Sequence, residues 1–353
     1  MSERRPRRVR DVLERALERA LDEIPPASGA VVMGTGIVSI ALLLDGRKLL
    51  STVLLVLAAA IWLALVWLLP AAIWPALAWL LPARAIAAPE WLRRDLGQPA
   101  ALTSIAGTCV LGTRLTLLGW EHFGEALLVV ALAVWLALVP LVLRNWRTPT
   151  VGASFILTVA TESLALLAAT LALVTHHRWL VYAALVPFCL GLVFYLFVLS
   201  AFQFRALLEG LGDHWVTGGA LAISALTCGR IALAAAATHA LAGEHALLET
   251  LALVLWCLMI AWLPALLIAE LVRPRLRYTV RRWSTVFPFG MYAACSFEVG
   301  AVTGTAGIGD FARVWVWVAV AVWALVFAAM LGKAPRLLAA PARRHLPGGD
   351  EGP

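Results

Sequence analysis

Long apolar stretches recur along the chain, each about as long as a bilayer crossing requires. A membrane-spanning helix needs about 20 consecutive, mainly apolar residues. Ten stretches meet this requirement, and connectors richer in charge or proline separate them. They cover residues 27–45, 49–70, 100–118, 126–143, 151–174, 179–204, 216–240, 246–271, 283–303 and 311–332. The pattern predicts an all-α integral membrane protein with ten transmembrane helices.

The polar side chains are not shared equally among these segments. The odd-numbered segments carry glycine, serine, threonine and charged residues, as in FILTVATESLALL, whereas the even-numbered segments are almost wholly aliphatic and tryptophan-rich, as in ALLVVALAVWLALVPLVL. Helices that face lipid favour apolar residues, while helices that line a cavity tolerate polar ones. We therefore expect five helical hairpins, with the odd helices in an inner pore ring and the even helices in an outer ring. The alternative is that the odd helices only pack closely on one another through small residues.

Composition and the ends of the chain agree with this class. The 353 residues are 62% hydrophobic and 14% charged, whereas soluble domains are about 45–50% apolar and about 25% charged. Leucines recur at helical spacing among charged residues near the start. This pattern predicts a cytoplasmic amphipathic arm at 1–24, followed by a transmembrane domain at 25–333 and a disordered cytoplasmic tail at 334–353.

The basic residues predict the orientation in the membrane. Of 28 Lys and Arg residues, 22 lie in the termini and in the connectors on the same side, and four lie on the opposite side. Cytoplasmic loops carry such an excess. We expect a multi-pass protein of the plasma membrane with both termini in the cytoplasm. The net charge of +7 is explained by these loops and needs no nucleic acid.

The sequence contains no pattern typical of an enzyme, a cofactor site or a metal site. All five cysteines lie inside apolar segments without a C-x-x-C pair, and there is no H-x-x-x-H, Walker or dinucleotide-binding motif. We therefore predict a protein that is not an enzyme and binds no cofactor or metal.

Four ionisable residues are predicted at similar depth on four odd helices. Arg114, Glu162, Arg230 and Glu298 each lie several turns from the cytoplasmic start of their segment. Charges at this depth pair with one another or line a water-filled path. Two explanations stay open: static ion pairs, or arginines that attract an anion while one glutamate carries a coupling proton. Either way, we expect Arg230 to pair with Glu162 or Glu298.

Four motifs resemble a known family in order along the chain. They are PPASGAVVMGTGIVS at 25–39, AGTCVLGTRL at 106–115, WVTGGALAISALTCGR at 215–230 and WSTVFPFGMYAA at 283–294. The chain resembles the tellurite-resistance/C4-dicarboxylate transporter family, which is related to the malic-acid transporters and the slow-type anion channels. The resemblance implies a homotrimer with one central pore per subunit, gated by a phenylalanine of the ninth helix. By motif position the gate is Phe287, with Phe289 as the second choice.

The resemblance and the polar pattern together give a candidate pathway. The expected lining consists of small and hydroxyl residues of the odd helices: Gly34, Thr35, Gly36, Ser39, Thr108, Thr113, Thr161, Ser224, Thr227 and Ser296. The expected substrate is a small anion, either a C4-dicarboxylate such as malate or an inorganic oxyanion such as tellurite or sulfite, with protons as a candidate co-substrate. The alternatives are an anion-selective channel without proton coupling and a membrane scaffold that transports nothing.

Overall fold

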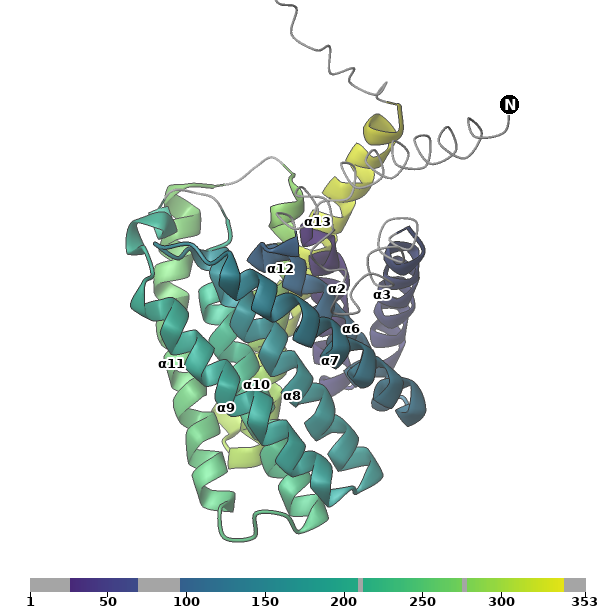
Figure 1. Cartoon of the computed structure of the whole chain (residues 1–353), viewed down its shortest axis with the longest axis vertical. Coiled ribbons are helices and arrows are strands. Elements are labelled where there is room, and N and C mark those ends of the chain that lie inside the picture. Colours follow the sequence, from purple (N-terminus) through teal and green to yellow (C-terminus); the bar gives the residue numbers. More distant parts are fainter. Residues whose placement is uncertain (1–25, 69–95, 209–211, 275–277, 340–353) are drawn as a thin grey trace, which may run out of the picture.

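The described part of the chain is a bundle of helices (Figure 1). A computed structural model of the protein describes residues 26–68, 96–208, 212–274 and 278–339. The predicted amphipathic arm at 1–24 lies outside the described residues, as do residues 340–353 of the predicted tail. The last helix continues to Ala339, beyond the predicted end of the transmembrane domain at 333.

Ten α-helices lie within the described ranges, so the predicted all-α class is confirmed there. In chain order they are α2 (Gly29–Leu44), α3 (Lys48–Leu68), α6 (Thr103–Thr116), α7 (Glu121–Arg144), α8 (Ile156–Thr175), α9 (Arg178–Ser200), α10 (Trp215–Thr238), α11 (His245–Val272), α12 (Trp283–Thr303) and α13 (Ala306–Ala339). Short 3₁₀ turns precede several of them, among them η1 (Pro26–Ser28), η3 (Pro99–Leu102), η4 (Gly152–Phe155) and η6 (Val280–Arg282).

Eight of these helical segments are long and apolar enough to cross a membrane. The other two, α2 with 16 residues and α6 with 14, are shorter as α-helices. Both are almost fully buried within the bundle. The protein is therefore a membrane protein with multiple apolar helices, as its composition predicts.

Consecutive helices pack as pairs, and each pair turns through a residue with positive φ. These residues are Gly46 (φ 78°), Gly119 (φ 91°), His176 (φ 57°), His239 (φ 52°) and Gly304 (φ 64°). A left-handed residue after the last helical turn satisfies carbonyls that the helix leaves unpaired and reverses the chain. The same turn device therefore recurs in all five pairs, which are α2–α3, α6–α7, α8–α9, α10–α11 and α12–α13.

Five of the helices form the inside of the bundle. Helices α2, α6, α8, α10 and α12 each pack on the next in this order, and α12 packs back on α2. In α8, α10 and α12, 78–94% of the apolar stretch is buried, whereas the corresponding share is 17–28% in α3, α7, α9, α11 and α13. This difference agrees with the predicted division, because the polar odd segments are the buried ones.

Candidate functional site

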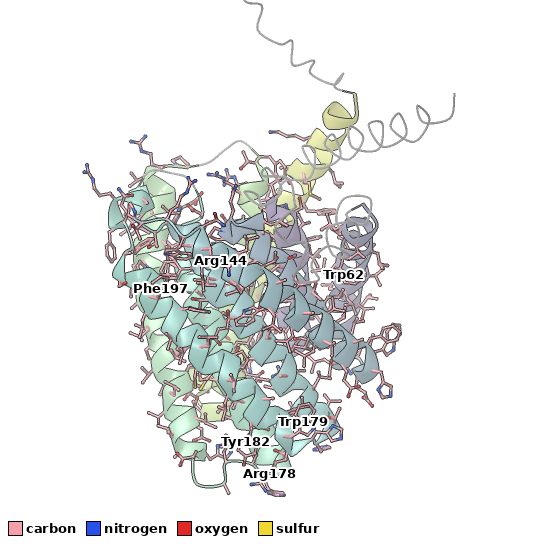
Figure 2. The ribbon with its side chains drawn as sticks, viewed as in Figure 1. Trp62, Arg144, Arg178, Trp179, Tyr182 and Phe197 are labelled. Atoms are coloured by element: carbon pink, nitrogen blue, oxygen red, sulfur yellow. The ribbon has the colours of Figure 1, made fainter. Side chains whose placement is uncertain are left out.

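Four outer helices are joined to the inner helices by the same kind of hydrogen bond. In each case the Nε1–H of an outer tryptophan donates to a hydroxyl on the inner helix of the next pair. The donor–acceptor distances are 3.0 Å for Trp62 and Thr108, 2.9 Å for Trp135 and Thr161, 2.8 Å for Trp256 and Ser296, and 3.1 Å for Trp323 and Thr35. Trp62 marks the α3 member of this set in Figure 2. We call these four bonds the indole joints.

The indole joints turn four of the predicted lining hydroxyls toward outer helices. Thr108, Thr161 and Ser296 each also donate their own hydrogen to a carbonyl one turn earlier in their helix. An anion needs hydrogen donors, and these hydroxyl hydrogens are already used. The joints therefore give these side chains a structural task that sequence patterns did not reveal. Sequence reasoning assigned the outer tryptophans to lipid, although their recurrence in four aliphatic helices was a visible signal.

Ser39, another predicted lining residue, ties α2 to its own outer partner α3. Its Oγ donates to the Ser51 carbonyl at 2.6 Å, and the Ser51 Oγ donates to the Ser39 carbonyl at 2.7 Å. Both side chains are fully buried. This reciprocal pair joins α2 to α3 at the point where Arg114 of α6 also bonds Ser51.

Gly34 and Gly36 allow α2 to lie close to both of its inner neighbours. A Cβ on Gly34 would lie 3.0 Å from the Trp283 ring of α12, and a Cβ on Gly36 would lie 2.7 Å from a methyl group of Val110 on α6. Close helix packing, the alternative raised for these residues, therefore accounts for both glycines. A role in exposing backbone to a path is not needed to explain them.

The two candidate gate residues have different surroundings. The Phe289 ring lies 4.5 Å from Trp215 and stacks at 5.3 Å on Trp315 of the outer helix α13, measured between ring centroids. Phe287 is fully buried on α12, and no stacked or edge contact joins its ring to another described aromatic residue. Phe289 thus packs toward the outer helix α13, and the assignment of Phe287 as the gate stays a prediction.

Arg230 and Glu298 form a buried ion pair between α10 and α12. Arg230 Nη2 donates to Glu298 Oε2 at 2.9 Å, and Arg230 Nε lies 2.5 Å from Glu298 Oε1. Each side chain is 3% exposed. The expectation that Arg230 pairs with a neighbour on the ring is confirmed, and the neighbour is Glu298. Gly229 makes room for the pair, because a Cβ there would lie 3.0 Å from the Glu298 Cγ.

Glu162 takes no part in an ion pair with any described residue. Its Oε1 accepts a hydrogen bond from Ser224 Oγ of α10 at 2.8 Å, and its Oε2 is buried without a hydrogen-bond partner in the described part of the chain. The side chain packs against Gly191 of the outer helix α9, where a Cβ would lie 2.5 Å from the Glu162 Cγ. At the contact between α9 and α10, where no indole joint occurs, the carboxyl group of Glu162 bonds the inner hydroxyl instead.

Arg114 is buried without a carboxylate among the described residues. Its Nε donates to Ser51 Oγ at 3.0 Å, and its Nη1 is buried without a partner. Removing such a charge from water costs several kcal/mol. One bond from a charged donor returns about 1.5–3 kcal/mol, and the position of Arg114 in the last turn of α6 returns about 0.3–1 kcal/mol more. Of the four charges predicted at similar depth, only Arg230 and Glu298 form an ion pair in the described part of the chain.

Two further lining candidates, Thr113 and Thr227, keep their hydroxyl groups uncommitted. Their Oγ1 atoms are buried, and within the described ranges neither has a hydrogen-bond partner. Both lie on inner helices, on α6 and α10. They are the predicted lining hydroxyls that have no hydrogen-bond partner in the described part of the chain.

Comparison with known proteins gives this arrangement a family. The SLAC1 family model, described as voltage-dependent anion channel, matches residues 23–331. Two uncharacterized membrane proteins, from two strains of Mycobacterium tuberculosis, are each 34% identical to the chain over 126 residues. That alignment covers 33% of this chain, and the chain spans only 62% of the length of each relative. Because the family model matches nearly the whole chain, including all five inner helices, the protein belongs to the voltage-dependent anion channel family.

Proposed function

We propose that this protein moves small anions across the plasma membrane through the centre of the ring formed by α2, α6, α8, α10 and α12. One observation carries the proposal: the family model of anion channels matches the residues that form this closed ring. Buried polar and charged side chains concentrate on the same helices, where a selective path requires them. The motif resemblance favours a C4-dicarboxylate such as malate, or an oxyanion such as tellurite or sulfite, as the substrate.

In this proposal all ten helices cross the bilayer as five hairpins. The two short helices gain length from the 3₁₀ turns that precede them directly, η1 before α2 and η3 before α6. At about 1.5 Å per α-helical residue and about 2.0 Å per 3₁₀ residue, each combined segment is about 30 Å long. That length equals the thickness of the hydrocarbon core, which is about 30 Å.

Both termini are placed in the cytoplasm, and the protein assembles as a homotrimer with one path per subunit. Arg144 belongs to the arginine-rich side by the loop count, and Arg178 belongs to the opposite side. Figure 2 has Arg178 and Tyr182 at the lower end of the bundle, with Arg144 well above them. The separation supports the orientation, and the motif resemblance supports the trimer.

Phe287 is the gate in this proposal. A fully buried aromatic ring on an inner helix can close a path by excluding water from a narrow apolar constriction. Replacing Phe287 with alanine removes the ring and is expected to raise anion flux. Phe289→Ala is the matched control on the same helix, because it removes packing against Trp215 and Trp315 and should leave the flux per folded protein unchanged.

The experiment is an anion flux assay on the purified full chain in proteoliposomes. Malate, sulfite, tellurite and nitrate are supplied one at a time, with and without a pH gradient. Flux that depends on the pH gradient identifies a proton-coupled carrier. Flux that is the same with and without the gradient identifies a channel. If no anion moves through wild type or through Phe287→Ala, the proposed function is wrong. If Phe289→Ala alone raises flux, the gate is Phe289.

A further inference from the structure

Arg114 carries a buried positive charge that no described carboxylate balances. Arginine keeps its charge at every physiological pH and carries five N–H donors. Among the described residues, only Ser51 Oγ accepts a hydrogen bond from Arg114, through its Nε–H, and the side chain is 1% exposed. Its Nη1 is buried without a hydrogen-bond partner in the described part of the chain, and no described carboxylate forms an ion pair with the guanidinium group.

Arg230 shows how the same chain neutralises an arginine on another inner helix. Glu298 balances its charge: Arg230 Nη2 donates to Glu298 Oε2, and Arg230 Nε lies beside Glu298 Oε1. Glu162, the other buried carboxylate among the four predicted charges, contacts Ser224 and Gly191 and forms no ion pair with a described arginine. Arg114 is thus the one buried arginine of the described chain without a counter-charge.

The surroundings of Arg114 are held in place by hydroxyl groups rather than by acidic ones. Ser51 accepts from Arg114 Nε and donates to the Ser39 carbonyl, so three helices meet at this point: α6, α3 and α2. The hydrogen of the Ser51 hydroxyl is used in that second bond. The network therefore fixes the direction of the guanidinium group and leaves its charge unbalanced.

We propose that Arg114 binds an anion at this junction of α2, α3 and α6, with Ser51 and Ser39 as the residues that position its guanidinium group. The ligand is a single carboxylate or oxyanion group, because the guanidinium fork matches two oxygens of such a group and balances one negative charge. Water could satisfy the N–H donors but not the charge. The site deepens the proposed transport function, yet it is tested by binding alone.

The test measures thermal unfolding of the detergent-purified full chain at constant ionic strength. Sodium malate and sodium nitrate are titrated separately against the sodium salt of a bulky sulfonate, so the two arms distinguish a carboxylate ligand from an inorganic oxyanion. A ligand that binds only the folded state raises Tm with concentration. We expect at least one of the two salts to raise the Tm of wild type, and Arg114→Met to abolish this response while raising Tm in the reference salt.

Arg230→Met is the matched control. It should lower Tm in every salt, since it leaves Glu298 unpaired, and it should keep the anion response. Arg114→Lys retains the charge but loses the planar fork, so half-saturation should need about tenfold more anion. The proposal is overturned if wild type does not respond to either salt, if Arg114→Met still responds, or if Arg114→Lys responds at the wild-type concentration. Wild type that binds anions but transports none would refute the proposed function and leave this site standing.

Discussion

Substitutions in the Arg230–Glu298 pair test whether water is excluded from the interior of the bundle. Both side chains are 3% exposed, and two contacts join them. Removing one partner of a buried pair costs about 3–5 kcal/mol, because the other charge stays buried without compensation. Replacing both with apolar residues of similar size is often neutral or stabilising by about 1–4 kcal/mol. We therefore expect Arg230→Met and Glu298→Met to be strongly destabilising alone and far less so together.

The two single variants should also differ from each other. Glu298 left alone can take up a proton and become neutral, whereas Arg230 left alone cannot lose its charge. We expect Glu298→Met to be the more damaging change. Equilibrium unfolding in mixed micelles, measured for the wild type, both single variants and the double variant, gives all four free energies.

The outcome of this cycle also decides what the pair does. Single variants that cost less than about 1 kcal/mol, in the range of exposed pairs, would falsify the view that the pair is shielded from water. If the double variant recovers folding but not anion flux, Arg230 acts on the substrate as well as on Glu298. If it recovers both, the pair is structural only.

Much of the fold follows from patterns in the sequence. The segment predicted at 283–303 coincides with α12, and the one at 246–271 differs from α11 by one residue at each end. The contrast between polar odd and apolar even segments predicted which helices are buried, because burial is the property that this contrast reports. Depth along neighbouring helices was enough to predict an ion pair for Arg230.

The direction of each polar side chain could not be predicted in the same way. In α8, 17 of 20 residues are buried, so no exposed face shows which side of the helix points to the centre. The hydroxyl of Thr35 bonds Trp323, which is 288 positions away in the sequence. Nor did any local pattern show that Arg114 lies beside Ser51 rather than beside a glutamate. Such pairings depend on how the helix pairs pack against one another, and that information is spread over the whole chain.

Two further substitutions test the contacts between outer and inner helices. Trp62→Phe removes one indole joint and should lower the free energy of unfolding by about 0.5–1.5 kcal/mol; Trp179→Phe, at a 64% exposed position, is its control and should change little. Gly191→Ala places a methyl group where a Cβ lies 2.5 Å from the Glu162 Cγ, so the carboxyl group must shift, and overpacking of this kind costs about 1–3 kcal/mol. Gly332→Ala, where nothing lies within 4 Å of the new Cβ, should be neutral or slightly stabilising. Adding Glu162→Ala to Gly191→Ala should relieve the clash, so the double variant is expected to lose less stability than the sum of the two single variants. Strict additivity would show that Glu162 does not fill the space beside Gly191. The view that Glu162 takes the place of an indole joint at the contact between α9 and α10 would then be wrong.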